Sequence, residues 1–191
     1  MNFILASASP QRKTILKKAG YKFRIIPSHA AETHPRKLGP AALVKHLALK
    51  KALSIAKEYP EEIILGADTL VFVGKRPIGK PRNVKDAQRI LRILSGAWQR
   101  VYTGVAVVQA GGKTKRTGAS VSYVKLKKLT AEEIIAASTK HLDKAGAYSI
   151  QHKKDRFVEK LRGDYDNVVG LPLRLVKKLL RGLSGRGLRR H

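Results

Sequence analysis

The pattern of hydrophobic and polar positions along this 191-residue chain changes period several times. Short apolar runs rich in β-branched residues predict strands, whereas apolar positions three or four residues apart predict amphipathic helices. Strands are predicted over residues 2–6, 21–26, 62–74, 145–150 and 156–163, and as a pair over 99–129 around Gly111 and Gly112. Helices are predicted over residues 9–20, 41–59, 84–96, 130–140 and 171–182. Strands and helices alternate early and a longer β section follows, so the expected fold class is α/β, of the mixed α+β kind.

Several of these boundaries carry local chemical signals. Ser9 followed by Pro10 is typical of a helix start. Thr130 and Glu133 have the spacing of a capping box for the helix that they open. Residues 27–40 contain three prolines and predict a loop longer than most connections, which makes this segment a candidate binding loop.

The composition limits the class of protein. Hydrophobic residues make up 43% of the chain, which favours a globular fold over disorder, and one domain is expected over residues 1–183. No run approaches the ~18 apolar residues of a membrane helix, and the start lacks a basic secretory leader. The chain contains no cysteine, which suits a reducing compartment. We therefore expect a cytoplasmic protein that does not enter a membrane.

The charge is unusual for a globular domain. Forty Lys and Arg residues against 13 Asp and Glu residues give a net charge of +27 at pH 7. Such a field raises encounter rates with polyanions, from nucleotides to nucleic acids and anionic lipids. The alternative is a generally basic, solvated surface. Cations are concentrated only near the C-terminus, where residues 184–191 are expected to form a flexible basic tail. No sequence signature of a nucleic-acid-binding domain is present, so contact with nucleic acid stays open and no specific recognition is predicted.

The stretch "LASASPQRKTIL", residues 5–16, offers the first candidate chemistry. If the chain turns here from strand to helix, the N–H groups of the helix start form a site for an anion. Ser7, Ser9, Arg12 and Lys13 would add hydroxyls and cations around that site. The alternative is structural, with Ser9 as a plain cap and Arg12 as a solvated cation.

Carboxylates in unusual surroundings supply further candidates. Asp68 stands in "ILGADTLVFV", where we expect the strand to be interrupted, and a carboxylate in an apolar run is costly unless it is paired or binds a metal. The alternative for Asp68 is a strand-end aspartate bonded to Thr69 or to a turn. Glu32, the first acidic residue of the chain, is either a ligand for a phosphate-bound cation or a solvated loop residue. Lys51 and Lys80 could each bind phosphate, although solvated lysines are common in so basic a chain.

Eight segments, taken together and in order, resemble the Maf family of nucleoside triphosphate pyrophosphatases. They are "LASASPQRKTIL", the loop around Glu32, "LALKKA", "GADTLV", "IGKPRN", "LSGAWQRVYTGVAVV", "DKAGAYSIQ" and "GDYDNVVGLPL". The resemblance runs from about residue 2 to residue 180. It implies an elongated mixed sheet with flanking helices and two lobes around a deep nucleotide-binding cleft, as in Maf and ITPase proteins, and usually a homodimer. The implied reaction is divalent-metal-dependent hydrolysis of a nucleoside triphosphate to the monophosphate and pyrophosphate.

The resemblance also implies roles for individual residues. Asp68 matches the catalytic aspartate, either as the base that activates water or as a metal ligand, and Glu32 with Asp68 would hold Mg²⁺ or Mn²⁺. Gln151, at the end of "AGAYSIQ", matches the pattern of the family branch that acts on pyrimidine nucleotides such as dTTP and UTP. Substrate and phosphate contacts are implied for Ser7, Ser9, Arg12, Lys51 and Lys80.

The chain departs from the family pattern at three positions. Gln11 stands where the family usually has an arginine, Gln99 where it usually has a histidine, and His152 where it usually has a glycine. The first change removes one phosphate contact that the resemblance would imply. Besides a pyrimidine pyrophosphatase that clears surplus or noncanonical nucleotides, two alternatives stay open. One is a purine-preferring enzyme that acts on dITP or XTP, and the other is a non-catalytic basic protein that binds nucleic acid or a partner on the same scaffold.

Overall fold

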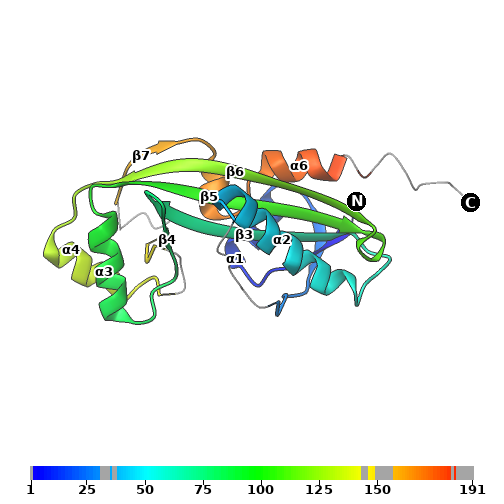
Figure 1. The fold of residues 1–191 in the computed structure, drawn as a ribbon, viewed down its shortest axis with the longest axis horizontal. Coiled ribbons are helices and arrows are strands. Elements are labelled where there is room, and N and C mark those ends of the chain that lie inside the picture. Colours follow the sequence, from blue (N-terminus) through cyan, green and yellow to red (C-terminus); the bar gives the residue numbers. More distant parts are fainter. Residues whose placement is uncertain are drawn as a thin grey trace, which may run out of the picture. The chain divides into compact units, whose positions relative to one another are not determined.

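The computed structural model describes residues 2–30, 35, 38–142, 146–148, 157–181 and 183. Figure 1 shows its strands and helices. The strands are β1 (Asn2–Leu5), β2 (Lys22–Ile25), β3 (Ile64–Val73), β4 (Arg76–Ile78), β5 (Trp98–Gln109), β6 (Thr114–Leu126) and β7 (Val158–Arg162). The helices are α1 (Pro10–Lys18), α2 (Pro40–Ala56), α3 (Val84–Leu94), α4 (Ala131–Ser138), α5 (Tyr165–Val169) and α6 (Leu173–Arg181). A short 3-10 helix (Ala110–Gly112) lies between β5 and β6, at the predicted turn.

Two predicted features of the strands are wrong. β3 runs from Ile64 to Val73 without the predicted interruption at Asp68. The Asp68 carboxylate forms an ion pair with Lys51, and the backbone of Asp68 stays in the sheet. Residues 146–148, which fall inside the strand predicted over 145–150, are not in a strand. Gly146 and Ala147 have φ angles of 85° and 56°, which strand geometry does not allow. The remaining residues of that prediction lie outside the described part of the chain.

The predicted helix starts are confirmed. Ser9 is the N-cap of α1, and its hydroxyl oxygen accepts a hydrogen bond from the backbone N–H of Arg12 at 3.5 Å. At the start of α4, Thr130 Oγ1 accepts from the Glu133 N–H at 3.2 Å, and Glu133 Oε2 accepts from the Thr130 N–H at 3.0 Å. These reciprocal bonds satisfy backbone donors that a helix start would otherwise leave unpaired.

The strands form one seven-stranded mixed sheet in the order β2-β1-β3-β5-β6-β7, with β4 paired to β3. β1 runs parallel to β2 and to β3, and Ile4 and Leu5 lie opposite Ile64 and Leu65. The β3–β4 and β6–β7 pairs are antiparallel. This arrangement confirms the predicted mixed α/β sheet with flanking helices.

Contacts along the chain divide it into two compact units. Unit 1 comprises Met1–Thr69, Thr103–Ser120 and Gly170–His191, and unit 2 comprises Leu70–Tyr102 and Val121–Val169. Each of the strands β3, β5 and β6 therefore contributes residues to both units. The nucleotide-binding cleft implied by the family resemblance stays a prediction.

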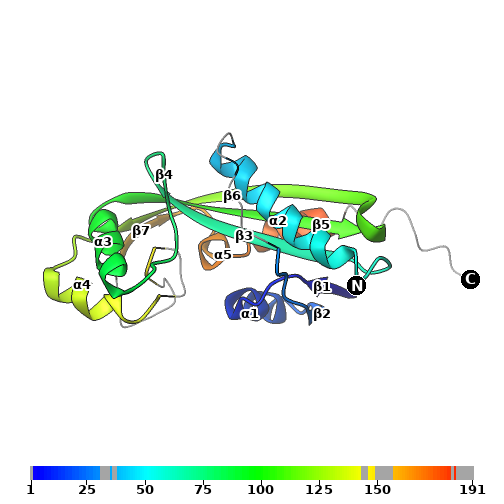
Figure 2. The same ribbon diagram turned by 60° about the horizontal axis from the view of Figure 1, so that its bottom comes forward.

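Where α2 crosses the strands of unit 1, one buried cluster is built largely from small side chains (Figure 2). Its buried members are Ile4, Ala6, Ala48, Ala52, Ile55, Ala56, Ile64, Ala106 and Val108. A Cβ atom at Gly66 of β3 would lie 2.3 Å from the carbonyl oxygen of Ala48, and one at Gly104 of β5 would lie 2.1 Å from that of Val44. Because both distances are far shorter than a van der Waals contact, only glycine lets the α2 backbone lie this close to the strands.

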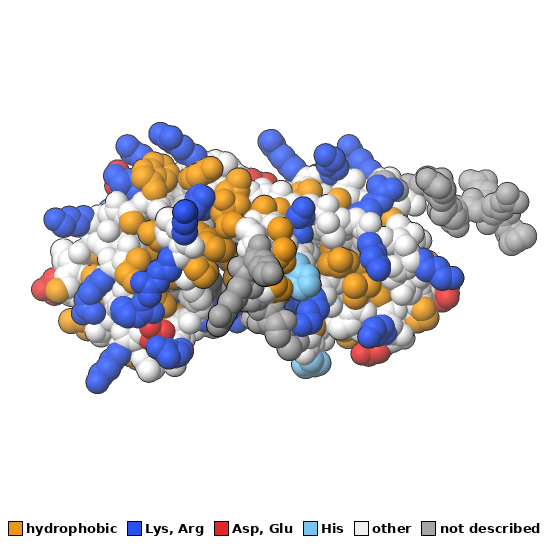
Figure 3. Space-filling model, viewed as in Figure 1, with side chains coloured by type: hydrophobic (Ala, Val, Ile, Leu, Met, Phe, Trp, Pro, Cys, Tyr) orange, Lys and Arg blue, Asp and Glu red, His pale blue; other side chains and the backbone are white. Residues whose placement is uncertain are grey.

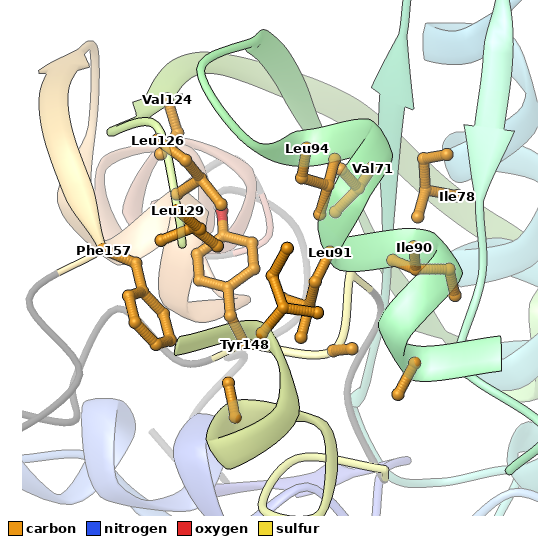
Figure 4. Packing of buried hydrophobic residues seen from close by; sticks show 14 of the residues in the cluster. Val71, Ile78, Ile90, Leu91, Leu94, Val124, Leu126, Leu129, Tyr148 and Phe157 are labelled. Atoms are coloured by element: carbon orange, nitrogen blue, oxygen red, sulfur yellow. The ribbon is translucent and has the colours of Figure 1, made fainter. Parts of the chain in front are cut away.

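The core of unit 2 is built from larger side chains. α3 and α4 lie side by side and pack against the sheet, and Figure 4 shows leucine, isoleucine and aromatic side chains filling the space between these elements. Leu91 and Leu94 of α3 are fully buried there, and Tyr148 and Phe157 are more than nine-tenths buried. Burial raises the pKa of Tyr148 well above its ordinary value.

Among the described residues, no helix combines the length and the apolar character that a membrane crossing requires.

Candidate functional site

The candidate site lies in unit 1, where β1 ends. β1 pairs with β3 as far as Leu5, which lies opposite Leu65, and the N–H of Ala6 donates to the carbonyl of Leu65 at 2.8 Å. Beyond this point the chain leaves the sheet through Ser7 and enters α1 at Pro10. Ligands of parallel sheets bind outside the carboxyl ends of the strands, where loops and helix N-termini come together. The sequence prediction of an anion site in this stretch therefore falls at a favourable place in the fold.

The Arg12 guanidinium is held in one orientation by three acceptors. Its Nη1 donates to Ser7 Oγ at 2.9 Å, its Nη2 to Thr69 Oγ1 at 3.2 Å, and its Nε to the carbonyl of Gly170 at 2.9 Å. These acceptors come from the end of β1, from β3 and from the residue after α5, so segments far apart in the sequence converge on one side chain. The alternative in which Arg12 is a solvated cation is therefore wrong.

A pair of threonines supports this arginine from the sheet. Thr69 Oγ1 and Thr103 Oγ1 are 3.0 Å apart and share a hydrogen bond between β3 and β5. The Thr69 hydroxyl also lies 3.4 Å from the carbonyl of Gly170. Thr103 is fully buried, so this hydroxyl pair is a fixed part of the interior rather than a surface contact.

The Asp68 carboxylate forms a buried ion pair with Lys51. Lys51 Nζ lies 2.6 Å from Asp68 Oδ1, and the two side chains are 15% and 8% exposed. The alternative in which Asp68 bonds to Thr69 or to a turn is therefore wrong. Lys51 projects from α2 and Asp68 from β3, so the pair depends on the close approach of this helix to the sheet.

Alternation along β3 separates the two groups of polar side chains. Gly66 and Asp68 are two residues apart and face α2, which supplies Ala48 and Lys51 against them. Thr69 is one residue further and faces the opposite side of the strand, where Arg12 reaches it. The sequence pair Asp68-Thr69 therefore joins a carboxylate–lysine pair to a guanidinium–hydroxyl network across one strand.

The other predicted site residues have different outcomes. Ser9 is close to the network, since its N–H lies 3.3 Å from Ser7 Oγ. Lys80 is an exposed residue of unit 2 that follows β4. Glu32 and Gln151 lie outside the described residues, so their predicted roles stay predictions.

Three participants were not singled out from the sequence as site residues. Thr69 and Thr103 are hydroxyl residues inside apolar strand runs, and the same signal that selected Asp68 could have selected them. The Gly170 carbonyl could not have been found, because a backbone acceptor depends on where the tertiary fold places it. Gly170 has a φ angle of 123°, which a residue with a side chain rarely adopts.

Two of the departures from the family pattern fall on described residues. The Ser9 hydroxyl, which was predicted to bind phosphate, donates its hydrogen bond to Gln11 Oε1 at 3.0 Å. The glutamine that replaces the family's arginine therefore accepts the hydrogen bond of this hydroxyl. Gln99, on the unit 2 part of β5, is fully buried. Its amide nitrogen and oxygen find no hydrogen-bond partner within the described part of the chain.

The residues at the site are compatible with a hard divalent cation. Magnesium is commonly held by one or two carboxylates together with substrate phosphates and water. Asp68 supplies one such carboxylate, which is buried next to Lys51. Within the described ranges, no three acidic or histidine side chains gather into a cage that would hold a metal by itself.

Comparison with known proteins gives one family and a consistent set of relatives. The family model described as "Maf-like protein" matches residues 2–183. A dTTP/UTP pyrophosphatase from Elusimicrobium minutum is 46% identical over 181 residues, which cover 95% of this chain and 98% of that protein. A dTTP/UTP pyrophosphatase from Bacillus cereus (strain AH820) and one from Bacillus anthracis are each 47% identical over 179 residues, with 92% of this chain and 93% of the relative covered.

A solved structure was also compared. The crystal structure of the nucleoside-triphosphatase, or dITP/XTP pyrophosphatase, from Mycobacterium abscessus aligns with a TM-score of 0.48 at 14% identity, over 98% of this chain and all of that one.

Proposed function

The chain belongs to the family of Maf-like proteins, and from this premise we propose that it hydrolyses nucleoside triphosphates to the monophosphate and pyrophosphate. The relatives at 46% and 47% identity are dTTP/UTP pyrophosphatases, which favours pyrimidine substrates and a role in clearing surplus or modified nucleotides. The observation that carries the proposal is the buried Lys51–Asp68 pair beside the Arg12 network at the carboxyl end of β1.

In this proposal the end of β1 and the start of α1 bind the triphosphate. The α1 N-terminus has no acidic residue in its first turn, and a helix N-terminus favours an anion. Ser7 and Arg12 supply a hydroxyl and a guanidinium that already contact each other at 2.9 Å. Such preorganised charge stabilises the negative charge that develops on a leaving pyrophosphate. Lys80 is proposed to contribute a further cation.

Asp68 is proposed to take the proton of the attacking water. Lys51 holds Oδ1 of the carboxylate at 2.6 Å, and no hydrogen bond to Oδ2 exists among the described residues. Oδ2 would accept the proton while the water oxygen forms its bond to the α-phosphorus. The bond between that phosphorus and the oxygen bridging to the β-phosphate then breaks, and pyrophosphate leaves. In this scheme Lys51 sets the orientation of the base.

A divalent cation is part of the proposal as a bound cofactor. Asp68, together with Glu32, would hold Mg²⁺ or Mn²⁺, which would supply Lewis-acid stabilisation of the phosphate oxygens. Asp68 then has two candidate roles, as base or as ligand, and both require its carboxylate. Removal of divalent cations with a chelator is expected to abolish turnover, and addition of Mg²⁺ or Mn²⁺ to restore it.

The test is pyrophosphate release from dTTP, UTP, CTP and dITP with Mg²⁺ or Mn²⁺, using the wild-type protein and Asp68→Asn. We expect pyrophosphate from the pyrimidine nucleotides and a loss of most activity in Asp68→Asn. Asp86→Asn is the matched control, because Asp86 is also a carboxylate paired with a cation, at 2.7 Å from Arg89, but lies in unit 2 outside the proposed site.

Three other outcomes of this assay would change the proposal. Release of orthophosphate would contradict cleavage between the α- and β-phosphates. A preference for dITP would assign the enzyme to purines, and full activity in Asp68→Asn would remove Asp68 from the mechanism.

A homodimer and a cytoplasmic location complete the proposal. The family resemblance supports the first, and the absence of cysteine from the sequence suits the second. Light scattering of the purified protein and fractionation of the source cells test them.

A further inference from the structure

One surface of unit 2 presents aromatic and basic side chains together. On β5, Trp98, Arg100 and Tyr102 alternate with the buried residues Gln99 and Val101. Because successive side chains of a strand point to opposite faces, the three even-numbered residues share the outer face of the sheet.

The neighbouring strands continue this surface. On β6, Val121, Tyr123 and Lys125 alternate with buried Ser122 and Val124. On β7, Arg162 lies directly opposite Tyr123 and Lys160 directly opposite Lys125. Paired residues of an antiparallel ladder face the same side, so these strands add an aromatic ring and cations to the outer face.

The aromatic rings are accessible. Trp98 is 39% exposed and Tyr123 is 43% exposed, which is unusual for such large apolar side chains. They line an open hollow of about 480 Å³ together with Val121, Arg162 and Gly163. The Arg162 guanidinium lies over the Trp98 ring, 5.2 Å from its centre. Figure 3 shows hydrophobic and basic side chains intermixed over β6 and β7.

The local charge of this face is positive. Arg100, Lys125, Lys160 and Arg162 are its cations, and Glu159 is the acidic residue on β7. Glu159 Oε2 lies 3.0 Å from Lys125 Nζ, and Glu159 Oε1 lies 3.9 Å from Lys160 Nζ. One carboxylate therefore partly neutralises two of the four cations, and the Arg162 guanidinium lies over the Trp98 ring.

We propose that this face binds single-stranded nucleic acid, with bases stacked on Trp98 and Tyr123 and phosphates held by Arg162 and the neighbouring cations. Exposed rings on a sheet, next to cations, are the means by which proteins hold unpaired bases. The cations of this face and the net charge of +27 favour an anionic partner here. The proposal is independent of the hydrolytic site in unit 1.

The chain supplies its own probe, because Trp98 is its one tryptophan. We expect an oligodeoxyadenylate of about twelve nucleotides to quench the Trp98 fluorescence. A purine sequence is chosen because the hydrolytic reaction is proposed to prefer pyrimidine nucleotides. An inorganic polyphosphate chain of equal charge should bind only weakly and leave the fluorescence unchanged, since it has no base to stack.

Variants separate stacking from charge. Fluorescence anisotropy of a labelled oligodeoxyadenylate should show a loss of about tenfold or more in affinity for Trp98→Ala and for Tyr123→Ala. Arg162→Ala should weaken binding more than Arg174→Ala, which removes the same charge from α6 in unit 1. Because Trp98 and Tyr123 are substantially exposed, both variants should fold, and Tyr123→Leu retains the bulk without the ring as a second test.

Three results would overturn the proposal. Equal losses in Arg162→Ala and Arg174→Ala would show that binding depends on net charge alone. Displacement of the oligonucleotide by polyphosphate at equal charge would show the same. Absence of quenching, together with a dimer that Tyr123→Ala converts to monomer, would assign this face to a second copy of the chain.

Discussion

The contact between α2 and the strands of unit 1 differs from the packing of α3 and α4 in unit 2. Unit 1 packs alanines of α2 against glycines of the sheet, and its helix backbone touches the strands at Gly66 and Gly104. Unit 2 keeps its helices away from the sheet with leucine, isoleucine and aromatic side chains. The difference lies in the size of the side chains between helix and strands at these two contacts.

The close approach in unit 1 has a chemical consequence. Gly66 lies against Ala48 and Ala52, which flank Lys51 on α2, and Asp68 follows two residues later on the same face of β3. The lysine therefore meets the carboxylate at 2.6 Å. Unit 2 has no comparable pair in its described core. The small residues at this contact therefore let the lysine of the helix reach the carboxylate of the strand.

The largest expected effect comes from adding one methyl group to the core of unit 1. In Gly104→Ala, the new Cβ atom would lie 2.1 Å from the carbonyl oxygen of Val44, so α2 must move. Overpacking against backbone is expected to cost about 3 kcal/mol, or roughly 6–12 °C in the melting temperature of a protein of this size. Because α2 carries Lys51, pyrophosphate release should fall as well. Calorimetry and the hydrolysis assay check the two parts.

Gly79→Ala is the control for this substitution. Gly79 lies in unit 2, and a Cβ atom there would find no neighbour within 4 Å. Its melting temperature should change little. If the two alanine variants melt at the same temperature, close packing of α2 is not what limits the core of unit 1.

The next effect concerns the ion pair itself. Lys51→Met keeps the length of the side chain but removes the cation that holds Asp68 Oδ1. Loss of one preorganised charged donor costs about a hundredfold or more in kcat, so we expect a fall of that size with KM changed less. Lys57→Met removes the same charge from the exposed end of α2 and should keep normal kinetics. Equal kinetics in both variants would contradict a positioning role for Lys51.

Removing one methyl group from the core of unit 2 should have a smaller effect. Ile90 of α3 is 3% exposed and packs among other large side chains. Ile90→Val should cost about 1 kcal/mol, or roughly 2–4 °C in melting temperature, because neighbouring side chains relax into the space. At a temperature where the variant is folded, pyrophosphate release should be unchanged. Reduced activity there would contradict the division of labour between the cores.

The fold was largely predictable because its determinants are local. The caps at Ser9 and Thr130 act within four residues, and the periods of the apolar runs locate most helices and strands. The segment 145–150 was mispredicted as a strand because its composition suits one, whereas the φ angles at Gly146 and Ala147 do not. Continuation of β3 through Asp68 depended on Lys51, seventeen residues away, which no local pattern shows.

The candidate site was predictable only in part. The cost of burying a charge selected Asp68, and the structure pairs it with Lys51, which was predicted as a phosphate ligand. The role of Arg12 was harder to foresee, since its acceptors include a hydroxyl 57 residues away and a carbonyl 158 residues away. Long-range convergence of this kind is a property of the folded topology, so residue types and spacing alone do not predict it.

The smallest expected effect is at Asp166, in the first turn of α5 in unit 2. Partial burial, and then the negative charge of Asp164, raise the pKa of Asp166 above its ordinary value. A carboxyl whose pKa is raised on folding binds its proton more readily in the folded state. It therefore destabilises the protein increasingly as the pH rises from the ordinary pKa of an aspartate through the raised one, and by a constant amount above that.

Asp166→Asn should therefore stabilise the protein slightly at neutral pH and leave it unchanged in acid below the ordinary pKa of an aspartate. Melting temperatures of the variant and the wild type, compared across this range, should diverge as the pH rises. In an Asp164→Asn background the gain should shrink, because the second cause of the raised pKa is gone while the acceptor for the Asp166 N–H, at 2.8 Å, can be kept by the amide oxygen. A gain that is the same at every pH would indicate a change in packing.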